Sequence, residues 1–290
     1  MNYLLKNNKK YKFDNNIIVE EIYEANNIEV CLEETGFNLF DKLDKSKAKL
    51  DENLLKIGKT KIKTIEANLP HFIDEYYSEF EIDLKLIKEA NKFVDKKGTR
   101  PALSGVYINS LGTIIATDSF KLYIYDKGNS NEYVILSQEL VNELCKFSNE
   151  KALLKFNKTA AKIILDNANT IITGRLINSQ YPNVFNLINV SNYTKLNFNK
   201  YDFQKIADIG KLVNGEITVL FENDEITFIG DNSYNCEFNS NIESYVMFEN
   251  INLALSVYDE DNVGLFYLSK EKPLIFNKNN KYVMIMIMRW

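Results

Sequence analysis

The hydrophobic and polar positions of this chain change period in an order that repeats from residue 82 onward. Asp83 is a predicted N-cap for a helix that runs through about Val94. Its apolar residues Leu86, Ala90 and Phe93 have the three- and four-residue spacing of one helical face. The next runs, ALSGVYIN and GTIIATDSFKLYIYD, are rich in β-branched and aromatic residues and contain Gly or Asn turns. This pattern predicts a helix followed by antiparallel strands.

A second helix completes the predicted unit. The strand-like run YVIL leads to Ser137, the expected N-cap of a helix whose buried positions are Leu140, Val141, Leu144 and Cys145. Three further strands are predicted at ALLKFN, AAKIILDN and TIITGRLI. Two helices packed on antiparallel sheets place the unit in the α+β class.

The same order recurs after a polar connector from about Asn178 to Asn197. Helices are predicted from Tyr201 to Leu212 and from Ile251 to Tyr258. The runs EITVLFEN, EITFIGD, YNCEFNS and SYVMFEN between them alternate with the period of two that is expected for half-buried antiparallel strands. Three strand-like runs, VGLFYLS, KPLIFN and KYVMIMIMRW, end the sequence.

The spacing of the predicted helices indicates a duplicated unit. The first helices begin at Asp83 and Tyr201 and the second helices near Ser137 and Asn250, so the two offsets are nearly equal. Residues 1–70, with strands over 11–34, a short helix from Phe37 to Leu43 and a hairpin, match only the second half of that unit. We therefore interpret 1–70 as a truncated or partial first unit, 71–190 as a middle domain and 191–290 as a C-terminal domain. An unrelated small domain over residues 1–70 is the alternative.

Composition is that of a globular protein, with 45% hydrophobic and 26% charged residues. No run approaches 18 apolar residues, and the first residues have too short an apolar core for a signal peptide, so we expect no membrane association and a cytoplasmic location. Cys31, Cys145 and Cys236 stand far apart without a CxxC pair, which predicts reduced thiols.

Catalytic patterns are missing from the sequence. His71 is the single histidine, and there is no GxGxxG, P-loop, GxSxG, HExxH or EF-hand loop. Asp118 is expected to accept hydrogen bonds from turn amides rather than act as a base. We expect no catalytic residue, no metal and no cofactor, and therefore no enzyme.

Four segments resemble the bacterial DNA polymerase III beta subunit, the DNA sliding clamp. TRPALSGVYIN and TIIATDSFKLYIYD are similar to the middle-domain pattern RPxLxGV followed by ATDGxRL. GRLINSQYPNVFNLI resembles the connector that leaves that domain, and KPLIF with YVMIMIMRW resembles the closing strand, which usually ends MPMRL. The resemblance covers most of the chain and implies the α+β DNA clamp fold, in which repeated units form a ring.

The departures from the family pattern fall on its motifs. Ser119, Phe120 and Lys121 replace the usual Gly, His or Tyr, and Arg. Asn189 stands at the connector proline, and the C-terminus carries Ile and Trp where Pro and Leu are usual. These changes, with the incomplete first unit, leave the number of subunits in a ring open.

The resemblance implies a processivity factor for DNA replication. Such a protein would encircle double-stranded DNA as a homo-oligomer, most simply a dimer, be loaded by a clamp loader, and tether DNA polymerase and other proteins that carry clamp-binding motifs. The alternative is a clamp-like peptide-binding module, or a decoy, that does not encircle DNA.

Cationic side chains on the first helix of each unit are the candidate DNA contacts, because phosphate contacts carry no sequence information and suit sliding. A solvated amphipathic helix face is the plain alternative for each stripe. The second helices are poor candidates, since Glu139 and Glu143 accompany Lys146 on one of them. The candidates are Lys85, Lys88, Lys92, Lys96, Lys97, Arg100, Lys200, Lys205 and Lys211.

A hydrophobic cleft for partner peptides is implied between the middle and last units. Methionine is flexible and polarisable, so a Met-rich edge can accommodate different partners. By period two, Met284, Met286 and Met288 would share one side of a strand, which is also what an ordinary core would show. The resemblance maps the cleft onto Leu103, Thr117, Lys121, Leu122, Met284, Met286, Ile287, Met288 and Arg289.

Overall fold

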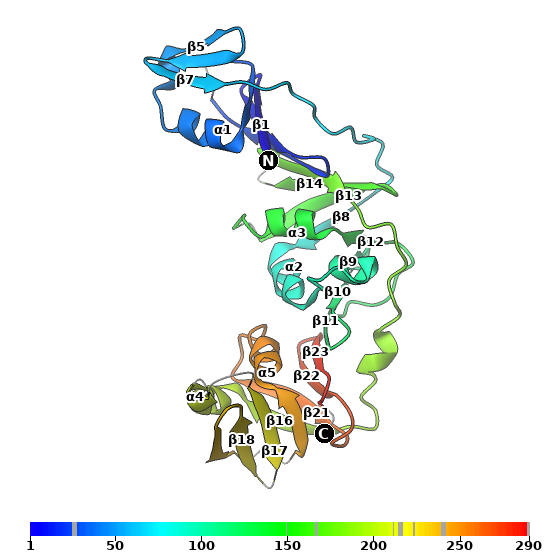
Figure 1. The fold of residues 1–290 in the computed structure, drawn as a ribbon. Helices are drawn as coiled ribbons and strands as arrows, with labels where there is room; N and C mark the ends of the chain where they lie inside the picture. The colour runs from blue at the N-terminus through cyan, green and yellow to red at the C-terminus, as the bar shows by residue number, and fades with distance from the viewer. Residues whose placement is uncertain are drawn as a thin grey trace. The chain divides into compact units, whose positions relative to one another are not determined.

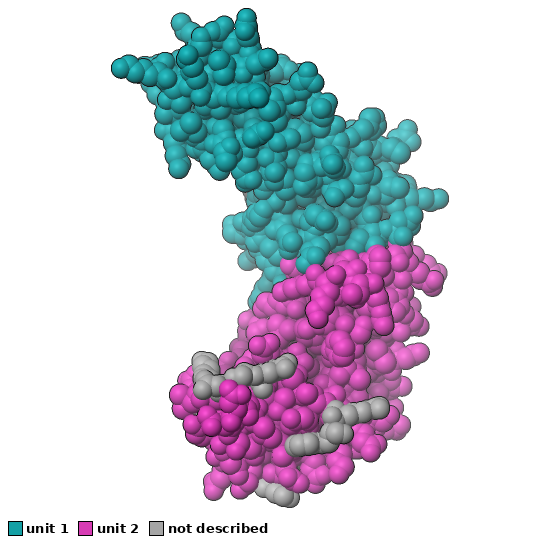
Figure 2. All heavy atoms as spheres, in the orientation of Figure 1, with its two compact units in different colours: residues 1–88, 134–178 teal, residues 89–133, 179–290 magenta. Residues whose placement is uncertain are grey.

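A computed structural model describes residues 1–24, 28–148, 150–165, 168–210, 212–213, 217–222, 224–238 and 242–288. The chain divides into two compact units, each made of two chain segments (Figures 1 and 2). Unit 1 contains residues 1–88 and 134–178, and unit 2 contains residues 89–133 and 179–290. None of the helices in the described ranges is both long and apolar enough to span a membrane.

Unit 1 contains an eight-stranded antiparallel sheet in the order β4-β1-β2-β3-β15-β14-β13-β8. The N-terminal segment and the middle of the chain meet in it, because β3 pairs with β15 through Ile17↔Gly174 to Glu21↔Thr170. A three-stranded sheet, β5-β6-β7, completes the unit. The strands are β1 (Asn2–Lys6), β2 (Lys9–Phe13), β3 (Ile17–Ile22), β4 (Val30–Glu33), β5 (Ala48–Asp51), β6 (Leu54–Ile57), β7 (Thr60–Lys63), β8 (Ser78–Asp83), β13 (Lys151–Phe156), β14 (Ala160–Leu165) and β15 (Thr170–Arg175).

Unit 2 repeats this arrangement. Its larger sheet has the strand order β9-β10-β11-β23-β22-β21-β16, in which β11 pairs with β23 as β3 pairs with β15. A four-stranded sheet has the order β19-β18-β17-β20. The strands are β9 (Val106–Asn109), β10 (Ile114–Thr117), β11 (Lys121–Tyr125), β16 (Thr194–Asn199), β17 (Thr218–Glu222), β18 (Glu225–Ile229), β19 (Ser233–Glu237), β20 (Ser244–Met247), β21 (Asn262–Tyr267), β22 (Leu274–Lys278) and β23 (Lys281–Ile285), while β12 (Tyr133–Leu136) lies at the boundary between the units.

Five α-helices lie within the described residues: α1 (Glu34–Asp41), α2 (Leu84–Ala90), α3 (Gln138–Leu144), α4 (Lys200–Gly210) and α5 (Phe248–Leu255). The predicted caps are confirmed, since Asp83 Oδ1 accepts from Leu86 N at 3.1 Å and Ser137 Oγ accepts from Leu140 N at 3.4 Å. Asn199 caps α4 in the same way. Short 3₁₀ helices occur at Lys45–Lys47, Asn91–Phe93, Pro101–Ser104 and Phe185–Ile188.

Several expected boundaries were wrong. α1 begins three residues and ends two residues earlier than the periodicity predicted. α5 is shifted three residues toward the N-terminus, because Phe248 to Asn250 of the SYVMFEN run already belong to it. α4 ends at Gly210 instead of Leu212. The buried face of α2 is formed by Leu84, Ile87 and Ala90, whereas Leu86 is half-buried. Phe93, in the 3₁₀ turn that follows the helix, is buried as expected.

One backbone hydrogen bond recurs three times along the chain. After the last strand of a sheet, the chain crosses back and donates an N–H to the outer edge of an earlier strand. These bonds are Ile65 N to Cys31 O at 2.9 Å, Ile177 N to Ile135 O at 3.0 Å and Met288 N to Tyr245 O at 2.7 Å. The N-terminal segment thus has the same returning backbone hydrogen bond as the two later parts of the chain. Among the three free thiols, Cys31 is buried and the other two are half-buried.

Candidate functional site

The turn between β10 and β11 is organised by the Asp118 carboxylate. Its Oδ1 accepts from Phe120 N at 3.0 Å and from Lys121 N at 2.9 Å, which confirms the structural role expected for this aspartate. Ser119 has a φ of 79°, a left-handed conformation that favours glycine, and the family pattern has Gly at this position. Thr117 Oγ1 accepts from Ser119 N, so side chains stabilise the strained turn. The turn leaves Phe120 69% exposed.

The terminal strand β23 lies directly beside this turn. Leu122 faces Met284 and Lys121 faces Ile285 in the β11·β23 ladder, and Met286 N donates to Phe120 O at 2.8 Å. Leu122 and Met284 are buried core residues, whereas Met286 is 39% exposed. Phe120 and Met286 therefore form a small apolar surface, which we name the Phe120–Met286 patch.

The expected alignment of three methionines on one strand face was wrong. β23 ends at Ile285 because its ladder partners Leu274 and Lys121 end there, so Met286 and Met288 lie beyond the strand. Met288 instead donates its N–H to β20, while Leu103 is buried and Thr117 Oγ1 is bonded to Lys121 O. Arg289 lies outside the described residues.

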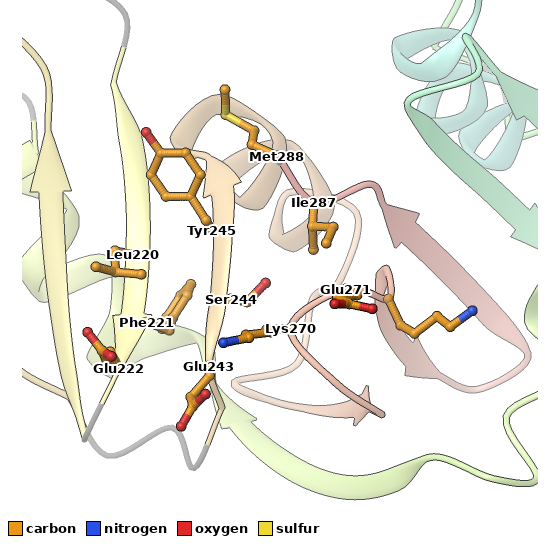
Figure 3. A pocket seen from close by; sticks show the side chains of 11 residues that line it. Leu220, Phe221, Glu222, Glu243, Ser244, Tyr245, Lys270, Glu271, Ile287 and Met288 are labelled. Atoms are coloured by element: carbon orange, nitrogen blue, oxygen red, sulfur yellow. The ribbon is translucent and has the colours of Figure 1, made fainter. Parts of the chain in front are cut away.

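A cavity of about 740 Å³ lies beside β20 in unit 2 (Figure 3). Two predicted residues, Ile287 and Met288, line it, and Figure 3 shows Met288 next to the ring of Tyr245. The sequence did not predict the rest of its lining, because β17 and β20 pair in one sheet, and the return of the chain after β23 adds Ile287 and Met288 beside them. The other lining residues are Leu220, Phe221, Glu222, Glu243, Ser244, Tyr245, Lys270, Glu271 and Lys272.

The predicted basic loop after α2 is held by one carboxylate. Asp95 accepts from Lys97 N at 3.0 Å, from Thr99 N at 3.1 Å and from Thr99 Oγ1 at 2.7 Å. The Thr99 hydroxyl and these amides lower the pKa of the Asp95 carboxyl. Lys96 and Lys97 are exposed, whereas the Arg100 guanidinium donates to Ser119 Oγ at 3.1 Å and so lies at the Asp118 turn.

Lysines on α2 and the turn that follows it differ in what their ammonium groups contact. Lys85 is exposed, and Lys92, also exposed, donates to Ser256 Oγ at 3.3 Å. Lys88 is half-buried, and its ammonium donates to the carbonyl oxygen of Phe147, just beyond the C-terminus of α3. Lys88 therefore compensates carbonyl charge at a helix end, in addition to any contact with solvent or DNA.

The three candidate DNA-contact lysines on and after α4 also differ in what the structure shows of them. Lys200 Nζ donates to Tyr258 O at 2.5 Å, beyond the C-terminus of α5. Lys205 is 57% exposed and lies 3.2 Å from Asp202 and 4.1 Å from the centre of the Tyr201 ring. Lys211 lies outside the described residues. Lys205 is thus the described lysine of α4 whose charge faces solvent.

In the described ranges, no group of three or more His, Cys, Asp or Glu side chains is placed to bind a metal ion. His71 is exposed. The candidate sites are therefore the cationic helix and loop residues, the Phe120–Met286 patch and the cavity beside β20.

Comparison with known proteins gives a consistent picture of the fold. No protein-family model and no curated protein matches this chain. Solved structures do match: the Helicobacter pylori beta clamp bound to a DNA ligase peptide has a TM-score of 0.81 at 15% identity and covers 100% of this chain and 91% of its own.

Two further solved structures cover the whole chain. The Bacillus subtilis DNA polymerase sliding clamp has a TM-score of 0.78 at 17% identity, with 90% of its own chain matched. The Bartonella birtlesii DNA polymerase III beta subunit bound to griselimycin has a TM-score of 0.80 at 16% identity, with 91% matched. At these identities the likeness is one of fold. The antiparallel α+β architecture is thus that of the bacterial DNA polymerase III beta subunit, the DNA sliding clamp.

Proposed function

We propose that this chain is a DNA sliding clamp, a processivity factor whose copies close around duplex DNA and tether a polymerase. The observation that carries the proposal is how the two larger sheets are assembled. Each sheet consists of two halves, which are joined by the pairing of β3 with β15 in one sheet and of β11 with β23 in the other. Counted along the chain, β3 and β11 are the third strands of their halves, and β15 and β23 are the last strands of theirs.

Two edge strands, β19 and β7, have the same positions in their sheets but are not paired with each other within the chain. β19 is the third strand of its sheet half, at one end of the order β19-β18-β17-β20, and β7 is the last strand of β5-β6-β7. Pairing β19 of one copy with β7 of the next would create a third sheet of the same kind. Because donor and acceptor edges differ, the contact is head-to-tail, and two copies suffice if the rotation closes.

The two edges carry opposite charge. The β6–β7 hairpin contains Lys56, Lys59, Lys61 and Lys63, of which the last three are exposed. The strands and turns at the other edge carry carboxylates at Glu222, Asp224, Glu225, Asp231 and Glu237. Complementary charge favours the correct partner edge and speeds association.

Helix ends near the edges support the same pairing. Where β11 meets β23, the turn after α2 lies beside the C-terminus of α5, as the bond from Lys92 to Ser256 records. The equivalent elements at the proposed junction are the C-terminus of α4 and that of α1. Leu212, just after α4, is 65% exposed and Leu39 on α1 is 44% exposed, so pairing would cover both side chains.

The exposed cations provide the proposed contacts with DNA. Lys85, Lys92, Lys96, Lys97 and Lys205 are exposed, and in a ring their ammonium groups would neutralise phosphate without reading sequence. Lys88, Arg100, Lys200 and Lys211 remain candidates from the sequence; the first three have a partner within the protein.

Partner proteins would bind at the Phe120–Met286 patch and the adjoining cavity. Both are continuous with the terminal residues Ile287 and Met288, which the resemblance places in a peptide cleft. One of the solved structures with a similar fold is a clamp bound to a DNA ligase peptide. We propose a DNA polymerase and other motif-bearing proteins as partners, and a separate clamp loader, with residues 71–190 and 191–290 acting as two clamp domains and 1–70 as a partial one.

Retention on circular DNA tests the proposal. Purified protein would be loaded on nicked circular plasmid, isolated by gel filtration in moderate salt, and then exposed to a restriction enzyme that linearises the plasmid. A ring should remain on the circle and slide off the linear form. Equal loss from both forms, together with a monomeric mass by light scattering, would instead support a clamp-like module that binds peptides without encircling DNA.

A further inference from the structure

The sheet β5-β6-β7 has no strand at a place where the later repeats have one. In the middle repeat β13 pairs with β8, and in the last repeat β21 pairs with β16, so the strand after each second helix has a neighbour on its outer side. β5 is the corresponding strand after α1, and within the described residues it pairs with β6 alone. An unpaired sheet edge is a template for another extended segment.

The hairpin turns align the first repeat with the middle repeat residue by residue. Both hairpins turn over two residues, after Asp51 in the first repeat and after Asn157 in the middle repeat. Leu50 therefore corresponds to Phe156. Because the residues that flank a two-residue turn are hydrogen-bonded to each other, the backbone N–H and C=O of Leu50 point away from β6, toward the free edge.

An apolar side chain of β5 is uncovered at this edge. Leu50 lies opposite Leu55, which is fully buried, yet Leu50 itself is 51% exposed. Its counterpart Phe156 is 2% exposed, because the rings of Tyr77 and Phe80 lie 5.7 and 5.6 Å from the Phe156 ring. Both rings belong to β8 or to the residue before it. A neighbouring strand is therefore what covers this position in the middle repeat.

Two lysines face each other across each of the two hairpins. Lys155 lies opposite Lys162 in the β13·β14 ladder, and β8 supplies Glu79, whose carboxylate lies 2.7 Å from the Lys155 ammonium. Lys49 lies opposite Lys56 at the same positions of the β5·β6 ladder. Like charges directly opposite each other destabilise a sheet, and a carboxylate from the next strand offsets that repulsion.

The first repeat has this lysine pair without the compensating strand. Lys56 is paired with Asp51 of its own hairpin. Lys49 is exposed, and no ion pair of Lys49 occurs among the described residues. A second copy of β5 would bring another lysine to the edge, so like charges oppose pairing between two copies. The edge is complementary to a strand that carries a carboxylate.

The place of a first helix, in contrast, is closed in the first repeat. β2 and β3 correspond to β10 and β11, because an aspartate accepts the same two hydrogen bonds in the turn between them. Ala116 on β10 is fully buried beside Tyr123, whose hydroxyl donates to Glu89 of α2 at 2.9 Å. Lys12 has the corresponding position on β2, and its ammonium lies 2.8 Å from Glu143 of α3. The open place is therefore that of a strand alone.

We propose that the free edge of β5 binds an extended segment of a partner protein, in the antiparallel register in which β8 lies on β13. The segment has a carboxylate opposite Lys49. It has an apolar side chain opposite Ala48, which covers Leu50 as Phe80 covers Phe156. Backbone hydrogen bonds provide affinity, and the alternation of acidic and apolar side chains provides selectivity. The inference goes beyond the proposed ring, because β5 is the edge opposite β7.

A peptide with the sequence of residues 77–83, YSEFEID, capped at both ends, is the probe for the full-length protein. The titration would follow the amide resonances of Lys49 and Leu50, and we expect both to shift. Binding should be about threefold tighter than that of the peptide with Glu79→Lys, since an exposed ion pair contributes modestly. The peptide that is N-methylated at the Phe80 amide lacks a donor to the edge and should not bind.

A charge reversal on the protein checks the register. Lys49→Glu should reverse the preference between the acidic peptide and the Glu79→Lys peptide. Lys158→Glu, in the corresponding turn of the middle repeat, is the matched control and should keep the preference. No shift at Lys49 and Leu50, equal binding of the N-methylated peptide, or an unchanged preference in Lys49→Glu would overturn the inference. Self-association of the free protein that Lys49→Glu alters would assign the edge to a second copy and would overturn it as well.

Discussion

The ammonium of Lys281 lies 2.7 Å from the carboxylate of Glu89, and both side chains are largely buried. Glu89 belongs to α2 and Lys281 begins β23, so the pair joins the middle of the chain to its last strand within unit 2. Tyr123 on β11 also donates to Glu89 at 2.9 Å. The β11·β23 junction beneath the Phe120–Met286 patch is therefore fixed by a buried polar network as well as by its strand ladder.

Removing one member of this pair should be costly. Lys281→Met leaves the Glu89 carboxylate buried without its cation, and we expect a loss of about 3 kcal/mol in the free energy of unfolding, measured with urea. The double variant Lys281→Met with Glu89→Gln should recover much of that loss. Lys205→Met, which breaks the exposed pair with Asp202, is the control and should change stability by about 0.5 kcal/mol or less. Equal losses in the single and double variants would contradict this role.

The Asp118 turn has a matched counterpart in unit 1. Asp14 Oδ1 accepts from Asn16 N at 2.8 Å and from Ile17 N at 3.2 Å, and Arg175 N donates to Asn16 O at 3.0 Å, as Met286 N donates to Phe120 O. Asp118→Ala should raise the hydrogen-exchange rate of the Met286 amide about tenfold, because the acceptor turn loosens.

Asp14→Ala is the control for that experiment. It should speed exchange at Arg175 and leave Met286 unchanged. If Asp118→Ala affects neither amide, the turn is held by the strand ladder alone, and the carboxylate does not position the Phe120–Met286 patch.

The basic loop should contribute to binding of duplex DNA through charge alone. Replacing Lys96 and Lys97 by Glu should weaken binding and reduce the slope of log Kobs against log salt by about 2, since each lost phosphate contact removes about 0.9. The measurement is a salt titration of binding to a short duplex. Lys270→Glu with Lys272→Glu, at the cavity rim, is the matched control and should keep the original slope. The same slope in both double variants would exclude the loop from the DNA contact.

Acid should weaken unit 1 through Glu143. Burial alone would raise the pKa of this carboxyl, but the hydrogen bonds and charges of Lys12 and Lys146 outweigh burial and lower it. A lowered folded-state pKa contributes stability that is present above the ordinary glutamate value, about 4.3, and is lost as the pH falls through the folded value.

Urea unfolding at pH 7 and at pH 3.5 measures this effect. Wild-type protein should lose more stability between the two values than Glu143→Gln, in which this titration is removed. The other carboxylates titrate in both proteins and cancel in the comparison. An identical pH dependence would show that the ion pairs of Glu143 contribute nothing.

Local features were predictable from the sequence because they depend on neighbours in the chain. The caps at Asp83 and Ser137 and the turn at Asp118 each bond to amides two or three residues away. The period of two identified most strands, and the duplicated order of helices and strands appears in the structure.

Features that depend on distant partners were not predictable. The ammonium of Lys200 bonds to Tyr258 O, and that of Lys88 to Phe147 O, so two lysines expected on a free cationic face contact helix ends instead. The end of β23 at Ile285 is set by the lengths of β11 and β22, which the pattern of methionines does not reveal. The cavity beside β20 likewise depends on the return of the chain at Met288.

The most direct test of ring closure is a disulfide between β7 and β19 of neighbouring copies. Cys236 on β19 provides one thiol, and Lys61→Cys or Lys63→Cys on β7 provides the other, with Cys31 and Cys145 replaced by Ala. Lys49→Cys, on the opposite edge strand β5, is the matched control. Head-to-tail pairing predicts that oxidation converts a β7 variant, but not the control, into a covalently closed species that resists removal from circular DNA by high salt. Equal cross-linking in all variants, or none in either β7 variant, would contradict closure through these strands.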